Sequence, residues 1–228
     1  MVKRFIDFFG AGVGLLLFAP FFTSIAIAIK LTSAGPVFFR QERLGLRGST
    51  FRIFKFRTMA TSRRPAGCLV TASDDHRITR FGAFLRRHKL DELPQLFNVL
   101  AGDMSLVGPR PEVQEFAAVF PAEYEEILTV KPGITHRATL LFRNEEEMLA
   151  GQDDPVGVYL ASVMPMKLKV YRAHLRQSAM EDLKIIALTV FPSLRAVRGL
   201  TGYDLGPEEM AALAPGVRSN RRAMKEMA

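Results

Sequence analysis

The chain has 228 residues, of which 48% are hydrophobic and 24% charged, a balance that suffices for one ordinary domain and excludes wholesale disorder. Its net charge of +8 and its pI near 9.9 indicate an anionic partner, namely nucleic acid, acidic lipid headgroups or a phosphorylated substrate. The single cysteine, Cys68, excludes an internal disulfide framework and fits a reducing cytoplasm.

An uncharged apolar run extends from Phe8 to Ile29, close to the N-terminus. A straight helix of about 22 residues, at ~1.5 Å per residue, would reach across a bilayer core of ~30 Å. Pro20 lies near the middle of the run and has no backbone amide hydrogen, and its ring clashes with the carbonyl of Leu16. The run therefore predicts a membrane helix with a kink or a break at Pro20.

The charges on either side of this run set its expected topology. Lys3 and Arg4 precede it, and arginines crowd the segment that follows Lys30. Because lysine and arginine mark the cytoplasmic side of a membrane segment, both ends are expected on that side, as in a re-entrant hairpin. A single span is the alternative. A cleaved signal peptide is disfavoured because its apolar region is shorter, about 7–15 residues.

Three glycines, Gly10, Gly12 and Gly14, lie inside the run. A dinucleotide-binding loop would need a preceding strand and an acidic residue about 20 positions later, and the sequence supplies neither. Small residues four apart, such as Gly10 and Gly14, instead favour close packing between helices. They are compatible with a homodimer formed through this helix.

A β-hairpin is expected after the membrane run. Gly35-Pro36 marks a turn, and residues Val37–Arg43 predict the first strand. Residues Thr50–Thr58 alternate polar with aromatic or β-branched side chains, which is typical of a second strand. Residues Ser62–Asp75 are expected to form an irregular loop.

The remainder of the chain is expected to be mainly helical, with breaks at proline and glycine. The predicted helical segments are Ile78–Ala101 interrupted by Pro94, Glu112–Val130 with a break at Pro121, Val156–Arg176, and Met180–Arg198. The stretch Gly102–Pro111, with two glycines and two prolines, is predicted to be a loop, and Lys131-Pro132-Gly133 a turn.

The stretch Arg40–Arg64 is strongly basic, with eight cations and one acid, Glu42. Lys55 and Arg57 share one face of the second predicted strand, and Arg52 lies on the opposite face. Paired cations on one face suit a diphosphate. The alternative for the stretch as a whole is adhesion to anionic lipid, worth about 1 kcal/mol per residue at a membrane surface.

Asp91 and Glu92 form an acidic pair after a cationic cluster and before Pro94. Aspartate can accept a phosphoryl group as an acyl phosphate when it is positioned and its charge is neutralised. Mg²⁺ would supply that neutralisation through oxygen ligands and retained waters. In the alternative interpretation the acids favour the first turn of a helix and pair with Arg87 and Lys89.

Arg110 is held between Pro109 and Pro111 in the predicted loop. Such rigidity would fix its guanidinium as an anion clamp, although the pattern is equally compatible with a purely structural turn. The four histidines show no metal-ligand spacing.

Taken together, these segments closely resemble the bacterial sugar transferases that start glycan assembly on a polyprenyl carrier, the monotopic phosphoglycosyl transferases. The resemblance covers roughly Lys3 to Thr189, and its motifs follow the order of the family. The matching motifs are Lys3-Arg4, Gly35–Arg43 (GPVFFRQER), Lys55–Met59 (KFRTM), Asp75–Arg80 (DHRITR), Leu90–Leu96 (LDELPQL), Gly102–Pro111 (GDMSLVGPRP) and Lys131–Thr135 (KPGIT).

The residues and the resemblance together imply an α/β fold of the helix-rich α+β kind, in three parts. Residues 1–34 would form a re-entrant membrane hairpin, a helix broken at Pro20. Residues 35–202 would form a small cytoplasmic catalytic domain with a β-hairpin and interfacial amphipathic helices, and residues 203–228 a poorly ordered basic tail. The resemblance places the protein among phospholipids at the cytoplasmic face of the bacterial inner membrane.

The resemblance also implies an activity, the transfer of a sugar 1-phosphate from a UDP-sugar to polyprenyl phosphate with release of UMP. This would be the first membrane step of glycan or exopolysaccharide assembly. By position, Asp91 would be the nucleophile and Mg²⁺ ligand, forming a covalent phospho-sugar intermediate, with Glu92 as its dyad partner and candidate base. The expected substrate-binding residues are Lys55, Arg57, Arg86 and Arg110.

The chain departs from the family's pattern in two places. Many members have Ser-Pro at the helix break, where this chain has Ala19-Pro20, so the angle of the bend is left open. After Lys131–Thr135 many members continue Gly-Trp-Ala-Gln-Val-Asn-Gly, whereas this chain reads His136–Phe142 and has no tryptophan, which indicates a different sugar pocket. The rival function is a non-enzymatic basic membrane-surface protein that binds anionic lipid. Nucleic-acid binding fits the charge but not the membrane run.

Overall fold

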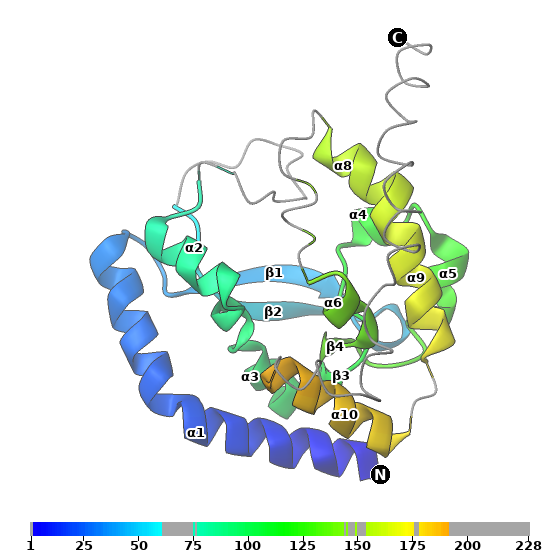
Figure 1. Cartoon of the computed structure of the whole chain (residues 1–228), viewed down its shortest axis with the longest axis horizontal. Helices are drawn as coiled ribbons and strands as arrows, with labels where there is room; N and C mark the ends of the chain where they lie inside the picture. Colours follow the sequence, from blue (N-terminus) through cyan, green and yellow to red (C-terminus); the bar gives the residue numbers. More distant parts are fainter. Residues whose placement is uncertain are drawn as a thin grey trace.

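The computed structural model describes residues 2–60, 75, 77–143, 145, 149, 154–175 and 178–191. This part of the chain is helix-rich with two small sheets, so the predicted fold class is confirmed. In Figure 1, helix α1 (Val2–Thr32) runs along the outside of the molecule, and the β-hairpin lies between it and the helices of the C-terminal half. The predicted tail, 203–228, and most of the predicted loop Ser62–Asp75 lie outside the described residues.

Helix α1 is continuous over 31 residues, with Pro20 inside it. Figure 1 shows that it bends part-way along its length, so a bend is present, whereas the predicted break into two helices is wrong. In the turn that follows, Thr23 donates its hydroxyl to the carbonyl of Ala19 at 3.2 Å and Ser24 to that of Pro20 at 2.9 Å. Such bonds bend a helix without ending it.

The outward side of α1 is apolar and exposed. Phe5, Leu16 and Leu31 keep 72%, 81% and 82% of their surface accessible. By its length and its mean hydropathy of 2.2, this helix is apolar enough to cross a membrane. Only 11% of its most apolar window is buried, which distinguishes it from the core helix of a soluble protein.

The inward side of α1 is attached to the domain by polar side chains near its start. Arg4 donates to two backbone carbonyls at the C-terminal end of α3 (Gln95–Ala101), at 2.7 and 3.0 Å. Asp7 is buried and accepts hydrogen bonds from the hydroxyl of Ser105 at 2.9 Å and the amide of Leu106 at 2.8 Å. Because the end of a helix leaves carbonyls unpaired, Arg4 completes α3 while it docks α1.

Gly10 and Gly14 face the same domain. A Cβ atom on Gly10 would lie 2.7 Å from Cδ1 of Leu106, and one on Gly14 would lie 3.2 Å from Cδ1 of Leu96. The close packing predicted for these glycines is therefore present, but it is made within the chain. Since both glycines are covered in this way, they give no support to the homodimer that their spacing predicts.

Strands β1 (Phe38–Leu44) and β2 (Thr50–Phe56) form the predicted hairpin and pair in antiparallel fashion. Helix α3 lies along the free edge of β2. The side-chain amide of Asn98 donates to the carbonyl of Arg52 and accepts from the amide of Phe54, both at 2.9 Å. Asn98 thus satisfies backbone groups that a third strand would otherwise bind.

The predicted helix Ile78–Ala101 is divided into α2 (Arg80–Arg87), the 3-10 turn η2 (Leu90–Glu92) and α3. The break at Pro94 is confirmed. The other break lies at Lys89, whose φ of 56° is in the left-handed region, and the sequence does not predict it because no glycine stands there.

A glycine docks α2 at the end of β2. The hydroxyl of Thr79 caps the helix by accepting from the amide of Gly82 at 2.9 Å, and the amide of Thr79 donates to the carbonyl of Thr58 at 3.0 Å. A Cβ atom on Gly82 would lie 2.0 Å from that same carbonyl oxygen, so only glycine fits.

Two very short strands, β3 (Ser105–Val107) and β4 (Gly133–Thr135), pair in parallel. The loop predicted for Gly102–Pro111 is present on both sides of β3, and the turn predicted at Lys131-Pro132-Gly133 leads into β4. The sequence does not predict the two strands themselves, because three residues are too few to show an alternating pattern. The strands meet at glycines: a Cβ atom on Gly133 would lie 2.0 Å from the backbone nitrogen of Gly108.

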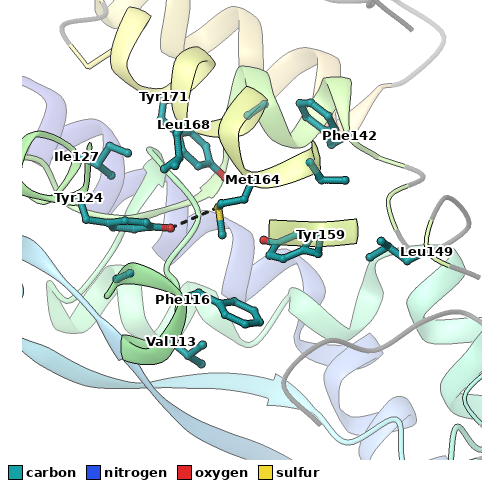
Figure 2. Close-up of a cluster of buried hydrophobic side chains, with 13 residues drawn as sticks. Val113, Phe116, Tyr124, Ile127, Phe142, Leu149, Tyr159, Met164, Leu168 and Tyr171 are labelled. Carbon is teal, nitrogen blue, oxygen red and sulfur yellow. Dashed lines mark hydrogen bonds between the residues drawn. The ribbon is translucent and has the colours of Figure 1, made fainter. Parts of the chain in front are cut away.

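The other helical segments are η1 (Leu46–Gly48), α4 (Gln114–Ala117), α5 (Pro121–Ile127), α6 (Arg137–Leu141), α8 (Pro155–Val158), the π-helical η3 (Tyr159–Val163), α9 (Met164–Ala173) and α10 (Ala179–Val190). Segments α8, η3 and α9 follow one another without interruption, as the single helix predicted from Val156 requires. Figure 2 shows the core of this half, in which the Tyr124 hydroxyl contacts the sulfur of Met164 at 3.8 Å, beside Phe116 and Tyr159.

Candidate active site

The carboxylate of Glu92 in η2 binds two cations from different elements. Nζ of Lys55 in β2 lies 2.8 Å from Oε1 of Glu92. Nη1 of Arg110, in the loop after β3, lies 3.1 Å from Oε2, and Nη2 contacts Oε1, so the guanidinium grips both oxygens. Only 12% of the Glu92 side chain is exposed, so these ion pairs are largely shielded from water.

The local backbone places the two acids at this point. The left-handed conformation of Lys89 ends α2, so Asp91 and Glu92 fall on a separate turn that packs on β2. Neighbouring residues of such a turn face different directions, so the two carboxylates have different surroundings.

The loop that carries Arg110 is fixed from both sides. Pro109 and Pro111 restrict the backbone, and the carbonyl of Pro109 accepts a hydrogen bond from the amide of Gly133 at 2.8 Å. The amide of Gly108 donates to the carbonyl of Thr135 at 2.9 Å. The loop is thus tied to β4, and Arg110 meets Glu92 from a rigid support.

The surrounding charges separate the pKa values of Asp91 and Glu92. Burial alone would raise the pKa of Glu92, but Arg110 and Lys55 outweigh it and hold that pKa well below its ordinary value. Burial and the nearby charge of Glu92 raise the pKa of Asp91, and the cations Lys55 and Arg86 only partly oppose this. Adjacent carboxylates whose pKa values are separated in this way are typical of catalytic sites.

Asp91 is 7% exposed, and its Oδ1 is buried without a hydrogen-bond partner among the described residues. Leaving such an oxygen unpaired costs about 1–3 kcal/mol or more, so it calls for an explanation such as a ligand or an ion. Arg86, predicted to neutralise phosphate charge, is near enough to act on the Asp91 carboxylate, as is Lys89.

Arg57, the other cation predicted for this strand, is engaged elsewhere. It follows β2 directly and is buried, and its guanidinium donates to the carbonyls of Ser33 and Ala34 at 2.8 and 2.6 Å. It also donates to the Ser33 hydroxyl at 2.8 Å. Arg57 therefore ties the end of α1 to the hairpin, and the structure does not bring its guanidinium to Glu92.

A second buried polar cluster lies next to Arg110 and is not predicted from the sequence. Glu112 accepts a hydrogen bond from the Tyr159 hydroxyl at 3.3 Å and lies 3.6 Å from Arg43. The Tyr159 hydroxyl in turn accepts from Nζ of Lys167 at 3.4 Å. Lys167 occupies a core position of α9, and a lysine at such a position is the signal that could have revealed the cluster.

Asp91 is the residue of this site that fits a magnesium ion. Its free Oδ1 is a hard oxygen ligand, and magnesium is usually held by one or two carboxylates together with substrate phosphates. Glu92 fits less well because both of its oxygens are engaged by cations. Within the described ranges there is no group of three or more metal-binding side chains, so substrate oxygens would have to complete the site.

Comparison with known protein families gives a match to the bacterial sugar transferases over residues 1–196. The chain belongs to this family. The resemblance drawn from the motifs is therefore confirmed, and the matched segment contains α1, both sheets and the Asp91–Glu92 turn.

Three relatives show how far the similarity extends. The UDP-N-acetylgalactosamine-undecaprenyl-phosphate N-acetylgalactosaminephosphotransferase of Aeromonas hydrophila is 44% identical over 139 residues, which are 59% of this chain and 32% of that protein. A UDP-glucose:undecaprenyl-phosphate glucose-1-phosphate transferase is 46% identical in Xanthomonas campestris pv. campestris (59% of this chain, 29% of that protein) and 37% identical in Escherichia coli K12 (84% and 40%). The chain thus spans well under half the length of these relatives.

Proposed function

We propose that the protein transfers a sugar 1-phosphate from a UDP-sugar to polyprenyl (undecaprenyl) phosphate and releases UMP. One observation carries this proposal: Oδ1 of Asp91 is a buried carboxylate oxygen without a partner, beside a lysine and an arginine that Glu92 holds. The name of the Xanthomonas relative describes a reaction of this class, from UDP-glucose to undecaprenyl phosphate.

In the first step, a carboxylate oxygen of Asp91 attacks the β-phosphorus of the UDP-sugar. A bond forms between this oxygen and phosphorus, the bond from phosphorus to the bridging oxygen of the diphosphate breaks, and UMP leaves with the electron pair. Lys55 and Arg110 stabilise the negative charge on the phosphoryl oxygens. Because Glu92 holds both cations before the substrate arrives, little reorganisation is needed.

In the second step, an oxygen of polyprenyl phosphate attacks the same phosphorus. The bond between phosphorus and Asp91 breaks, the carboxylate is restored, and the sugar is left joined to the polyprenol through a diphosphate. The acceptor phosphate is largely ionised at neutral pH, so the step needs no strong base. The depressed pKa of Glu92 makes it a weak base, and we assign it the role of holding Lys55 and Arg110 in place of the base expected from the sequence.

A magnesium ion, when bound, would neutralise charge on the diphosphate. Asp91 would hold it from the protein side through the oxygen that no other described group uses.

We further propose that α1 enters the cytoplasmic leaflet of the bacterial inner membrane and returns, among phospholipids. Its outward side is apolar, and both of its ends contact the same domain. Arg4 and Asp7 hold its start to α3 and β3, and Arg57 holds its end to β2. A helix that crossed the bilayer would have to break one of these sets of contacts.

The test is UMP release by the full chain in detergent or nanodiscs, with magnesium, polyprenyl phosphate and a panel of UDP-sugars. We expect release that depends on both substrates, stops on chelation of the metal, and is lost in Asp91→Asn. The variant Glu125→Gln, at an exposed acid of α5, serves as the control and should keep full activity. Binding to anionic vesicles without UMP release from any UDP-sugar would favour the non-enzymatic membrane-surface protein.

A further inference from the structure

Gln95 carries a buried amide that has no partner. It is the first residue of α3, it is 1% exposed, and its Nε2 makes no hydrogen bond within the part of the chain that the structure describes. A buried donor without an acceptor costs about 1–3 kcal/mol, whereas an apolar side chain of the same length would cost nothing of this kind. A hydrogen-bond acceptor supplied by a ligand would explain why the amide is retained at this position.

Gln95 lies about one turn after Asp91 along the chain. Leu93 and Pro94 both have right-handed helical φ and ψ, so the chain keeps turning in the same sense across the break between η2 and α3, with i→i+3 hydrogen bonds from the amide of Leu93 to Leu90 and from that of Leu96 to Leu93. Residues three or four apart in such a right-handed turn are close to one another, and Asn98 follows Gln95 by three residues within α3. Gln95 thus lies one turn after Asp91 and one turn before Asn98.

Contacts with β2 hold the segment from η2 to α3 at two points. Asn98 bonds the backbone of Arg52 and of Phe54, and Glu92 bonds the side chain of Lys55. Gln95 lies between these two attachments in the sequence, and its side chain is buried, as is that of Asp91 one turn before it.

The two unpaired atoms are chemically complementary, and yet they do not bond to each other. Nε2 of Gln95 is a donor and Oδ1 of Asp91 an acceptor, and each is buried without a partner among the described residues. A group that fits between them must accept a hydrogen bond from the amide and react with the carboxylate. A phosphoryl group meets both conditions, since its phosphorus is electrophilic and its non-bridging oxygens are acceptors.

We propose that Nε2 of Gln95 donates a hydrogen bond to a non-bridging oxygen of the transferred phosphoryl group, both during attack by Asp91 and in the covalent intermediate. This inference rests on the proposed function and adds a neutral donor to the cations Lys55 and Arg110. The bond strengthens as negative charge gathers on the oxygens, so it acts on the transition state more than on substrate binding.

The test replaces Gln95 by methionine, which keeps the length of the side chain and removes the donor. We expect the kcat of Gln95→Met to fall about 100-fold, with the KM for the UDP-sugar within about twofold of the wild-type value. The melting temperature should stay equal or rise, since a buried unpaired amide is removed. The phospho-sugar adduct on the protein should form more slowly by the same factor in rapid-quench experiments.

Two further variants make the result specific. Gln95→Glu keeps the shape but places an anion against the phosphoryl oxygens, so it should lose more activity than Gln95→Met. Gln114→Met, at the exposed first residue of α4, is the matched control and should leave kcat unchanged.

The inference is overturned if Gln95→Met keeps a kcat within twofold of wild type, or if its loss of activity is matched by a lower melting temperature, which would mark a purely structural residue. An inactive wild-type chain would instead overturn the proposed function itself, so the two failures are distinguishable.

Discussion

The Glu92 carboxylate is shared between Lys55 and Arg110, and neither cation has another acid at hydrogen-bond distance in the described structure. Glu92→Gln keeps the shape and removes the charge, leaving two largely buried cations without their counter-ion. We expect the free energy of unfolding to fall by about 3 kcal/mol, and kcat/KM to fall with it because the cations are no longer fixed. Denaturant unfolding and UMP release measure the two effects.

Glu125→Gln removes one negative charge from an exposed side chain outside the site. It should leave both the free energy of unfolding and kcat/KM unchanged. A Glu92→Gln protein as stable as the control would show that Glu92 does not hold the two cations.

Single residues also show what the sequence could predict about the site. Asp91, Glu92 and Arg110 could be singled out from the sequence because their charges and the neighbouring prolines are visible in the chain, but only the resemblance to the family assigned them catalytic roles, which stay predictions. The role of Arg57 was not, because its partners in the segment after α1 precede it by 23 and 24 residues, and a strand pattern does not reveal such contacts. Gln95 was missed as a site residue because a neutral amide gives no signal until its burial is known.

Among the elements, α1 and its docking face offer a matched pair of glycines. Gly10 lies against Leu106, whereas a Cβ atom on Gly12 would have nothing within 4 Å. Gly10→Val should therefore destabilise the docked helix by about 1–3 kcal/mol through overpacking, and Gly12→Val should not. The melting temperature in detergent measures the difference. Equal melting temperatures for the two variants would mean that α1 is not seated on β3 as described.

A histidine at the start of helix α6 should make the stability of the fold depend on pH. His136 caps the helix, its Nδ1 accepting from the amide of Ala138 at 3.2 Å. Burial lowers the pKa of His136 from 6.5 to about 3, and the neighbouring His174 adds to this. Below pH 6.5 the unfolded chain therefore binds a proton that the folded chain does not, and stability falls as the pH falls.

Acidification from pH 7 to pH 5 should accordingly lower the free energy of unfolding by about 2 kcal/mol through the protonation of His136 in the unfolded chain. His136→Asn keeps a capping side chain and should abolish that part of the loss, as measured by denaturant unfolding at the two pH values. His88→Asn, at an exposed histidine, should retain it. An unchanged pH dependence in His136→Asn would contradict the buried, neutral ring.

For the molecule as a whole, the contacts at both ends of α1 predict that the N-terminus and the catalytic domain lie on one side of the membrane. Single cysteines, Val2→Cys and Arg47→Cys, in a Cys68→Ala background would report this. A membrane-impermeant maleimide should label both positions in inverted vesicles and neither in intact spheroplasts. Labelling of one position in each preparation would establish a single span in place of the re-entrant helix.

The secondary structure could be predicted from the sequence in segments long enough to show a periodic pattern. It could not be predicted in very short elements that depend on tertiary contacts. The apolar run, the hairpin and the C-terminal helices each have enough residues to show a period. Strands β3 and β4 have three residues each, and the turn at Lys89 has no glycine to mark it, so the sequence shows no recognisable pattern for either feature. These two features nevertheless determine where Arg110 and Glu92 meet.

The proposed mechanism requires that Asp91 becomes covalently phosphorylated, and the mass of the protein tests this most directly. After incubation with magnesium and an accepted UDP-sugar, without polyprenyl phosphate, we expect the mass to rise by one sugar phosphate group, on the peptide that contains Asp91. Addition of polyprenyl phosphate should remove the group, and Asp91→Asn should never acquire it. Rapid turnover with no adduct, or an adduct on another residue, would contradict the account.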